Sequence, residues 1–112
     1  MSWSPMAAGD GRTSHHTFTT DSGIFSLSGI LASAIALHLE DINNSLALYI
    51  CTGSWNITDG PGGTADFTPS PADLLASNPL GNPGTYRAYP VVTLSSGPVP
   101  MDAQVIRVVS LP

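Results

Sequence analysis

The sequence has no lysine, and its three arginines are outnumbered by eight acidic residues. Nucleic-acid binding requires cations that face phosphates, so we expect no DNA or RNA partner. Only 10% of the residues are charged, although mixed surface charges normally keep a small free domain dispersed. We therefore hypothesise that neighbouring copies or partner proteins cover much of the surface.

Cysteine and long apolar runs are also scarce. Cys51 is the only cysteine, which excludes an internal disulfide and a cysteine-based zinc site. We interpret Cys51 as a small buried hydrophobic residue. The longest apolar segment, GILASAIALHL, is interrupted by Ser33 and His38 and is too short to span a bilayer, so we expect no membrane partner.

Motifs that carry chemistry are missing as well, since the chain contains no GxSxG, HExxH, CxxC or Walker-type spacing. His15 and His16 would point to opposite faces of a strand, so we interpret them as surface or interface residues rather than metal ligands. The string from Asp59 to Gly63 (DGPGG) lacks the ligands of a calcium loop and the lysine of a phosphate loop, and is typical of a turn. We predict no enzyme, no catalytic residue, no cofactor and no metal.

Eleven glycines and ten prolines are spread along the 112 residues. Such regular breakers leave only short segments, which predicts a single all-β domain of antiparallel strands. The predicted strands are residues 13–20, 24–30, 34–41, 46–55, 64–69, 84–94 and 103–111. A helix from Leu31 to Leu39 is the competing interpretation of the third segment, because alanine and leucine favour helices.

The alternation of apolar residues predicts which side chains form the core. The core residues predicted in this way are Trp55, Phe67, Ile106 and Val108. Residues 46–55 are apolar almost throughout, which predicts a strand with both faces covered.

Three local signals predict breaks in the strands. Ser70 and Pro71 are typical of a helix start and predict a short helical turn over residues 70–77. Pro90 lacks an N–H group and predicts an edge position or a bulge. Gly97 and the proline after it predict a turn.

Asp73, in the expected helical turn, is followed by Gly84-Thr85-Tyr86-Arg87-Ala88. This arrangement resembles the corner of immunoglobulin-like sandwiches, in which a turn with aspartate leads into Gly-x-Tyr at a strand start. The resemblance implies that the Tyr86 hydroxyl bonds back to the corner backbone, with Asp73 and Gly84 as structural residues. Ala88 stands where antibody domains have cysteine, and the spacing from Asp73 to Gly84 is longer than in that corner.

The strings LSGILASAIALHLED, DGPGGTADFTPSPADL, GTYRAYPVVTLSSGPV and QVIRVV lie between Thr17 and Val109. Together they resemble the small Ig-like β-sandwich domains of tailed-bacteriophage virions, found in baseplate upper, neck, fibre and capsid-decoration proteins. The resemblance implies an Ig-like sandwich of about seven strands over residues 13–112. It also implies a non-enzymatic virion component, present in many copies or as a homo-oligomer, whose partners are capsid, neck or tail subunits.

Residues 1–12 are interpreted as a flexible or partner-docking N-terminal arm. We expect Trp3 and Met6 in this arm, with Tyr89 and Val91 on an uncharged face, to contact neighbouring subunits.

The alternative function is a carbohydrate- or receptor-binding module used in host attachment. It would use residues such as His38, Asn82 and Tyr89.

Overall fold

The computed structural model describes residues 6–110, and these fold almost entirely into β-strands and the turns between them. The strands are β1 (Met6–Ala7), β2 (Ser14–Thr17), β3 (Thr19–Thr20), β4 (Gly23–Ile24), β5 (Ile35–Asp41), β6 (Ala47–Ile50), β7 (Ser54–Asp59), β8 (Thr64–Thr68), β9 (Gly84–Leu94), β10 (Gly97–Pro100) and β11 (Gln104–Val109). Three single turns of 3-10 helix, η1 (Ala32–Ala34), η2 (Ala72–Leu74) and η3 (Pro79–Gly81), interrupt them. The all-β prediction is confirmed, with more strands than expected because several are only two residues long.

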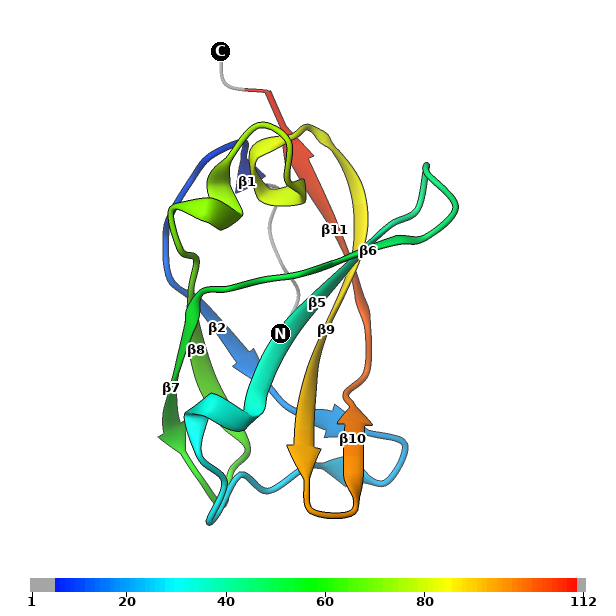
Figure 1. Ribbon diagram of the computed structural model, residues 1–112. Helices are drawn as coiled ribbons and strands as arrows, with labels where there is room; N and C mark the ends of the chain where they lie inside the picture. Colours follow the sequence, from blue (N-terminus) through cyan, green and yellow to red (C-terminus); the bar gives the residue numbers. More distant parts are fainter. Residues whose placement is uncertain (1–5, 111–112) are drawn as a thin grey trace.

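The strands form two main sheets (Figure 1). The larger sheet has the order β1-β11-β9-β5-β6, with β10 paired to β9, and the smaller has the order β2-β8-β7. All pairs are antiparallel except β1 with β11, which is parallel. β3 and β4 form a separate short hairpin. In Figure 1 the smaller sheet lies on the left, and the chain after β6 crosses from the larger sheet to reach it.

One hydrophobic core lies between the two sheets and draws side chains from both. Many of its members come from alternate positions of β5, β8, β9 and β11, as the period of two in each strand requires. The core residues include Phe18, Leu37, Leu39, Trp55, Phe67, Tyr86, Val92, Ile106 and Val108. Trp55 lies between two phenylalanines, with ring centroids 5.3 Å from Phe18 and 5.1 Å from Phe67.

Of the two positions predicted for Pro90, an edge or a bulge, the edge is wrong, because Pro90 lies inside the larger sheet beside an interruption of the pairing along one side of β9. β9 pairs with β11 along its first half and with β10 along its last residues, and Pro90 lies where the partner changes. Leu37, opposite Pro90, accepts a bond from Cys51 and therefore directs its backbone toward β6 rather than β9. The Pro90 carbonyl accepts from the Met101 N–H instead, at 2.8 Å. The missing N–H of proline thus removes no bond between β9 and β5.

The predicted helical turn over residues 70–77 is present only as η2, with η3 following it. Ser70 accepts a bond from the Asp73 N–H, at 3.3 Å, as expected of a residue at a helix start. The competing helix from Leu31 to Leu39 is reduced to η1, because β5 begins at Ile35 and its alternating burial requires a strand.

Two further local predictions are wrong. Residues 24–30 form a strand only at β4, and the rest is loop. The turn predicted at Gly97 and Pro98 lies two residues earlier, at Ser95 and Ser96, and Gly97 begins β10 with a φ of 127°. Glycine adopts this φ without strain, so it can open the strand directly after the turn.

The described part of the expected N-terminal arm is attached to the larger sheet. Met6 and Ala7 pair with the end of β11, and Ala8 donates to the Val109 carbonyl at 2.8 Å. Gly9 donates to the carbonyl of Leu80 in η3, also at 2.8 Å. Trp3 lies outside the described residues, as does the remainder of the arm before Met6.

Candidate functional site

The most concentrated polar site is built around Asp73, whose side chain is fully buried. The Tyr49 hydroxyl donates to Asp73 Oδ1 at 2.7 Å, and the backbone N–H of Thr52 donates to the same atom at 2.8 Å. The backbone N–H groups of Gly53 and Ser70 donate to Oδ2 at 2.9 and 3.0 Å. One carboxylate therefore fixes the segment that crosses from β6 to β7 against the turn that leads out of β8.

The ionisation of this site fits a structural duty. Burial alone would raise the pKa of Asp73, but the bonds from Thr52, Ser70, Tyr49 and Gly53 outweigh it, so the pKa lies below its ordinary value. Burial and the neighbouring Asp73 raise the pKa of Tyr49 to about 12. Hydrogen-bond donors from the same chain therefore occupy the acceptor sites of the Asp73 carboxylate. Asp73 stays ionised near neutral pH.

Tyr86 forms a second structural contact at the start of β9. Its ring is buried, and its hydroxyl donates to the carbonyl of Asn82, four residues earlier, at 2.7 Å. A Cβ atom at Gly84 would lie 3.0 Å from the Tyr86 hydroxyl oxygen, so glycine gives the ring the room it needs. The Tyr86 hydroxyl therefore bonds back to the backbone upstream, whereas Asp73 contacts the β6–β7 crossing rather than Tyr86.

We expect Tyr86→Phe to lower the free energy of unfolding by about 1–2 kcal/mol, because the bond to Asn82 is lost inside the fold. Urea unfolding measures this change. Tyr89→Phe is the matched control, since its hydroxyl bonds to Glu40 on the outer face, and the loss there is expected to stay below about 1 kcal/mol. Equal losses in the two variants would contradict a special role for the Tyr86 bond.

The outer face of the larger sheet carries the residues expected to form an uncharged contact surface. Tyr89 is half-buried, and its hydroxyl donates to Glu40 at 2.7 Å. Arg87 pairs with the same Glu40 at 3.1 Å and lies 5.5 Å from the centre of the Tyr89 ring. Val91 is buried and exposes only 8% of its surface. The face around Tyr89 is therefore charged and internally paired, which corrects the expectation of an uncharged surface there.

The residues of the alternative binding module do not form one site. His38 and Tyr89 are neighbours across β5 and β9, with ring centroids 5.4 Å apart. Asn82 lies after η3, at the beginning of the segment that leads into β9. The sheet brings two of the three residues together.

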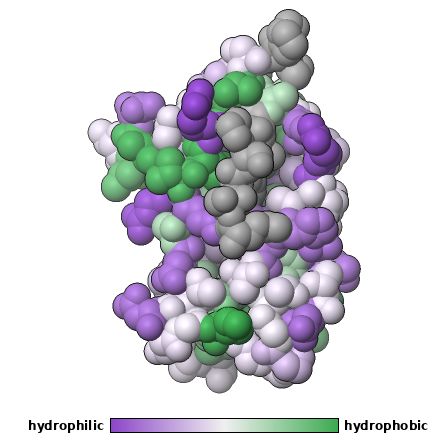
Figure 2. Space-filling view, turned by 180° about the vertical axis from the view of Figure 1, so that it is seen from behind, coloured by the Kyte–Doolittle hydropathy of each residue, from purple (hydrophilic) through white to green (hydrophobic). Residues whose placement is uncertain are grey.

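The apolar surface lies instead on β6 and on the hairpin that leads into it. Ile42, Leu46, Leu48 and Ile50 are all exposed, each showing between 40% and 53% of its surface. The prediction that both faces of residues 46–55 are buried is therefore wrong for β6. Only the face with Tyr49 and Cys51 turns toward the core, because the core lies on one side of the sheet, and β6 is the last strand of that sheet (Figure 1). The hairpin projects from the body, and Figure 2 shows it as a hydrophobic protrusion at the upper left.

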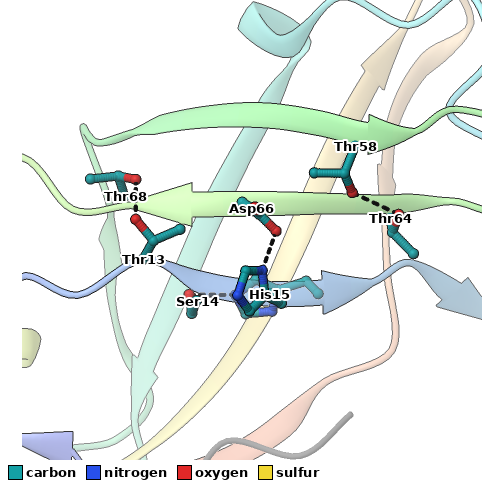
Figure 3. Close-up of polar contacts among 8 residues, drawn as sticks. Thr13, Ser14, His15, Thr58, Thr64, Asp66 and Thr68 are labelled. Atoms are coloured by element: carbon teal, nitrogen blue, oxygen red, sulfur yellow. Dashed lines mark hydrogen bonds and ion pairs between the residues drawn. The ribbon is translucent and has the colours of Figure 1, made fainter.

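The outer face of the smaller sheet is polar by contrast. Figure 3 shows hydroxyl pairs joining Thr13 to Thr68 and Thr58 to Thr64, each at 2.8 Å. Between them the His15 ring bonds to Asp66 at 2.5 Å. These contacts link neighbouring strands along the sheet, so their polar groups are used within the fold.

His16 is buried, which corrects its interpretation as a surface or interface residue. It follows His15 in β2 and therefore points to the opposite face, where its ring lies 5.3 Å from that of Trp55. Burial lowers the pKa of His16 to about 4, although Asp66 acts in the opposite direction.

The lowered pKa predicts a loss of stability in mild acid. His16 stays neutral in the folded protein down to about pH 4, whereas the unfolded chain binds its proton near pH 6.5. Stability is therefore fully present above pH 6.5 and falls as the pH drops toward 4, by about 3 kcal/mol. Urea unfolding from pH 7 to 4 measures the slope, and His16→Gln should flatten it. An unchanged slope in this variant would assign the effect to other groups.

Residues 6–110 contain neither a cluster of metal ligands nor a membrane-spanning helix. No group of three or more His, Cys, Asp and Glu residues in that range is arranged to hold a metal ion. Asp59 accepts from the Gly62 N–H at 3.1 Å, as a turn residue does. Cys51 is buried, and burial raises the pKa of its thiol. No helix within the described range has the length and apolar character needed to cross a membrane.

The four predicted core residues, Trp55, Phe67, Ile106 and Val108, are all buried. Of the predicted contact residues, Met6 is described only as part of β1.

Sequence reasoning missed Tyr49, which completes the Asp73 site, and Leu48 and Ile50, which form the apolar edge. The alternation of Leu46, Leu48 and Ile50 against Tyr49 was the available signal, but it does not reveal which face meets the core.

No protein-family model matches the chain, and no curated protein matches it at a significant level.

Proposed function

We propose that this chain is a non-enzymatic structural component of a tailed-phage virion, an Ig-like β-sandwich that acts through contacts between subunits. The proposal places it among capsid-decoration, neck or tail proteins, in many copies per particle. The observation that carries the subunit-contact part is the exposed apolar edge at β6, in a chain with few charges. The virion setting rests on the resemblance of its sequence to the Ig-like domains of phage structural proteins.

The strand arrangement supports the Ig-like part of the proposal. Ig-type sandwiches divide their strands between two sheets, and a tyrosine near the start of one strand bonds back to the backbone upstream. Here two sheets share one core, and Tyr86 bonds back to Asn82 near the start of β9. β1 pairs in parallel with β11 and forms one edge of the larger sheet.

The use of the polar groups supports a non-enzymatic role. Asp73 is held by donors from its own chain, Glu40 pairs with Arg87, and Asp66 pairs with His15. A catalytic group needs a position from which it can reach a substrate, and a nucleophile needs a base beside it. These three carboxylates instead bind groups of the same chain and hold strands and turns together.

The proposal is tested by deleting the coding sequence from the phage that encodes the chain and supplying the protein in trans. We expect deletion to lower the yield or the salt and heat stability of particles, and the wild-type protein to restore both. Particles with normal yield and stability after deletion would contradict the structural role.

A glycan array with the isolated protein tests the alternative of host attachment. Subunit contact predicts no glycan signal. A specific signal that is lost in Tyr89→Ala would replace the structural role with carbohydrate binding.

A further inference from the structure

β6 is an edge strand whose outward backbone groups are positioned to pair with another strand. Cys51, directly after β6, donates to the Leu37 carbonyl of β5 at 2.9 Å. Alternate residues of an antiparallel strand face the same neighbour, so Tyr49 and Ala47 also face β5. Leu48 and Ile50 therefore direct their N–H and C=O groups away from β5, toward the open side of the sheet.

The protection usual for such an edge is absent from β6. Natural sheets blunt open edges with lysine, proline, bulges or inward charges. The chain has no lysine, and the segment from Ile42 to Thr58 contains no charged residue and no proline. The edges of the smaller sheet differ, because the outward side chains of β7 include Asn56 and Thr58 and those of β2 include His15.

The turn that leads into β6 also supports an interaction at this edge. Ser45 and Leu46 have φ values of 53° and 57°, and the Ala47 N–H donates to the Asn44 carbonyl at 3.0 Å. Such a turn favours Asn-Gly, because a bulky residue with positive φ is strained. Leu46 nevertheless exposes half of its surface, so the contacts of its side chain within one copy offset little of the backbone strain in the turn.

We infer that the β6 edge is the site at which a second copy of this chain pairs, strand to strand and antiparallel, about a twofold axis at Tyr49. This inference rests on the proposed function, in which the chain acts through contacts between subunits. The register places Leu48 of each copy opposite Ile50 of the other, so that the two residues exchange both backbone hydrogen bonds. The same register brings their side chains together on the outer face of a continuous sheet.

A second copy fits this edge in charge and in area. No charged residue lies on the paired segments, so pairing sets no like charges directly opposite each other, and Glu40, the neighbour of Leu48 on β5, is paired with Arg87. Strand pairing brings the exposed side chains of Leu48 and Ile50 from the two copies into contact, and both remain on the outer face of the sheet. An edge pair of this kind buries less than the roughly 1,600 Å² of a standard interface, as expected of a weak, reversible dimer.

Sedimentation equilibrium of the full chain, from about 10 µM to about 1 mM, tests the inference. We expect a reversible monomer–dimer equilibrium with a dissociation constant on the order of 100 µM. Leu48→Lys should weaken it at least tenfold by placing a charge on the edge. Leu48→Pro should abolish it, because it removes an N–H that faces the open side and leaves the bonds to β5 in place.

Two further variants keep the test specific. Asn56→Lys puts the same charge on β7 and should leave dimerisation unchanged. Leu46→Gly should raise the thermal midpoint of the monomer by relieving the turn and should weaken the dimer. Circular dichroism confirms that each variant folds.

Three results would overturn the inference. The first is a wild-type monomer at every concentration, and the second is a dimer that Leu48→Lys and Leu48→Pro leave unaffected. The third is a β6 edge protected from hydrogen exchange in assembled particles while the isolated chain stays monomeric. That outcome would assign the edge to a different virion protein and would leave the proposed function standing.

Discussion

Replacing Asp73 with alanine is expected to lower the free energy of unfolding by about 3–5 kcal/mol. The substitution removes the acceptor for the Tyr49 hydroxyl and for the backbone N–H groups of Thr52, Gly53 and Ser70. A buried donor left without an acceptor costs far more than the average hydrogen bond contributes. Urea unfolding at pH 7 measures the loss, provided that both proteins unfold in one cooperative step.

Asp59→Ala is the matched control for this prediction. Asp59 is exposed and accepts one backbone bond in a turn, so its loss should cost less than about 1 kcal/mol. Comparable losses in the two variants would contradict the view that Asp73 organises the crossing between the sheets.

The acid behaviour of Asp73→Asn provides a second check on the same residue. Because the pKa of Asp73 is lower in the folded protein than its ordinary value of 3.8, the unfolded chain takes up the proton first as the pH falls. The contribution of Asp73 is therefore present above that value and is lost below it. We expect Asp73→Asn to lack the loss of stability that protonation of Asp73 causes in the wild type. That loss occurs at lower pH than the loss assigned to His16.

Gly53→Ala is expected to destabilise the protein by about 3 kcal/mol or more, the second large effect. A Cβ atom at Gly53 would lie 2.2 Å from the Thr68 carbonyl oxygen and 2.7 Å from the Phe67 ring. The first of these contacts is with backbone, which cannot move without breaking the pairing of β7 with β8. The thermal midpoint and urea unfolding both report the change.

Gly60→Ala serves as the control for Gly53. Its Cβ would lie 3.4 Å from the nearest atom of Ser28, so we expect a change within about 1 kcal/mol of zero. A tolerated Gly53→Ala would show that the crossing can relax, and would contradict the tight packing of β7 on the core.

The strands that could be predicted from the sequence are those whose alternation is strict. In β5, Ile35, Leu37 and Leu39 alternate with more polar residues, and the inward face follows directly. β9 shows the same pattern from Tyr86 to Pro90, and Val91, which is buried on the other face, interrupts it. Local periodicity is enough for these strands, because one side is apolar and the other is not.

β6 could not be predicted in the same way, because both of its faces are apolar. Leu48 and Ile50 alternate with Tyr49 and Cys51, so hydrophobicity alone gives no preference between the faces. The choice is made by Asp73, which binds the Tyr49 hydroxyl from 24 residues away in the sequence. Contacts of that range depend on the assembled fold and leave no local signal.

His16 illustrates a related limit. Alternation in β2 predicts that His15 and His16 point to opposite faces, and they do. Which of them is buried depends on the pairing of β2 with β8, where His16 lies opposite the buried Ala65. A short polar strand does not encode that register by itself.

Under the proposed function, quantitative mass spectrometry of density-gradient-purified phage particles tests the subunit role most directly. We expect the chain in a fixed ratio to the major capsid or tail subunit, in many copies, and retained through repeated purification. Its absence from the particles, or a trace amount that varies between preparations, would contradict a structural role in the virion.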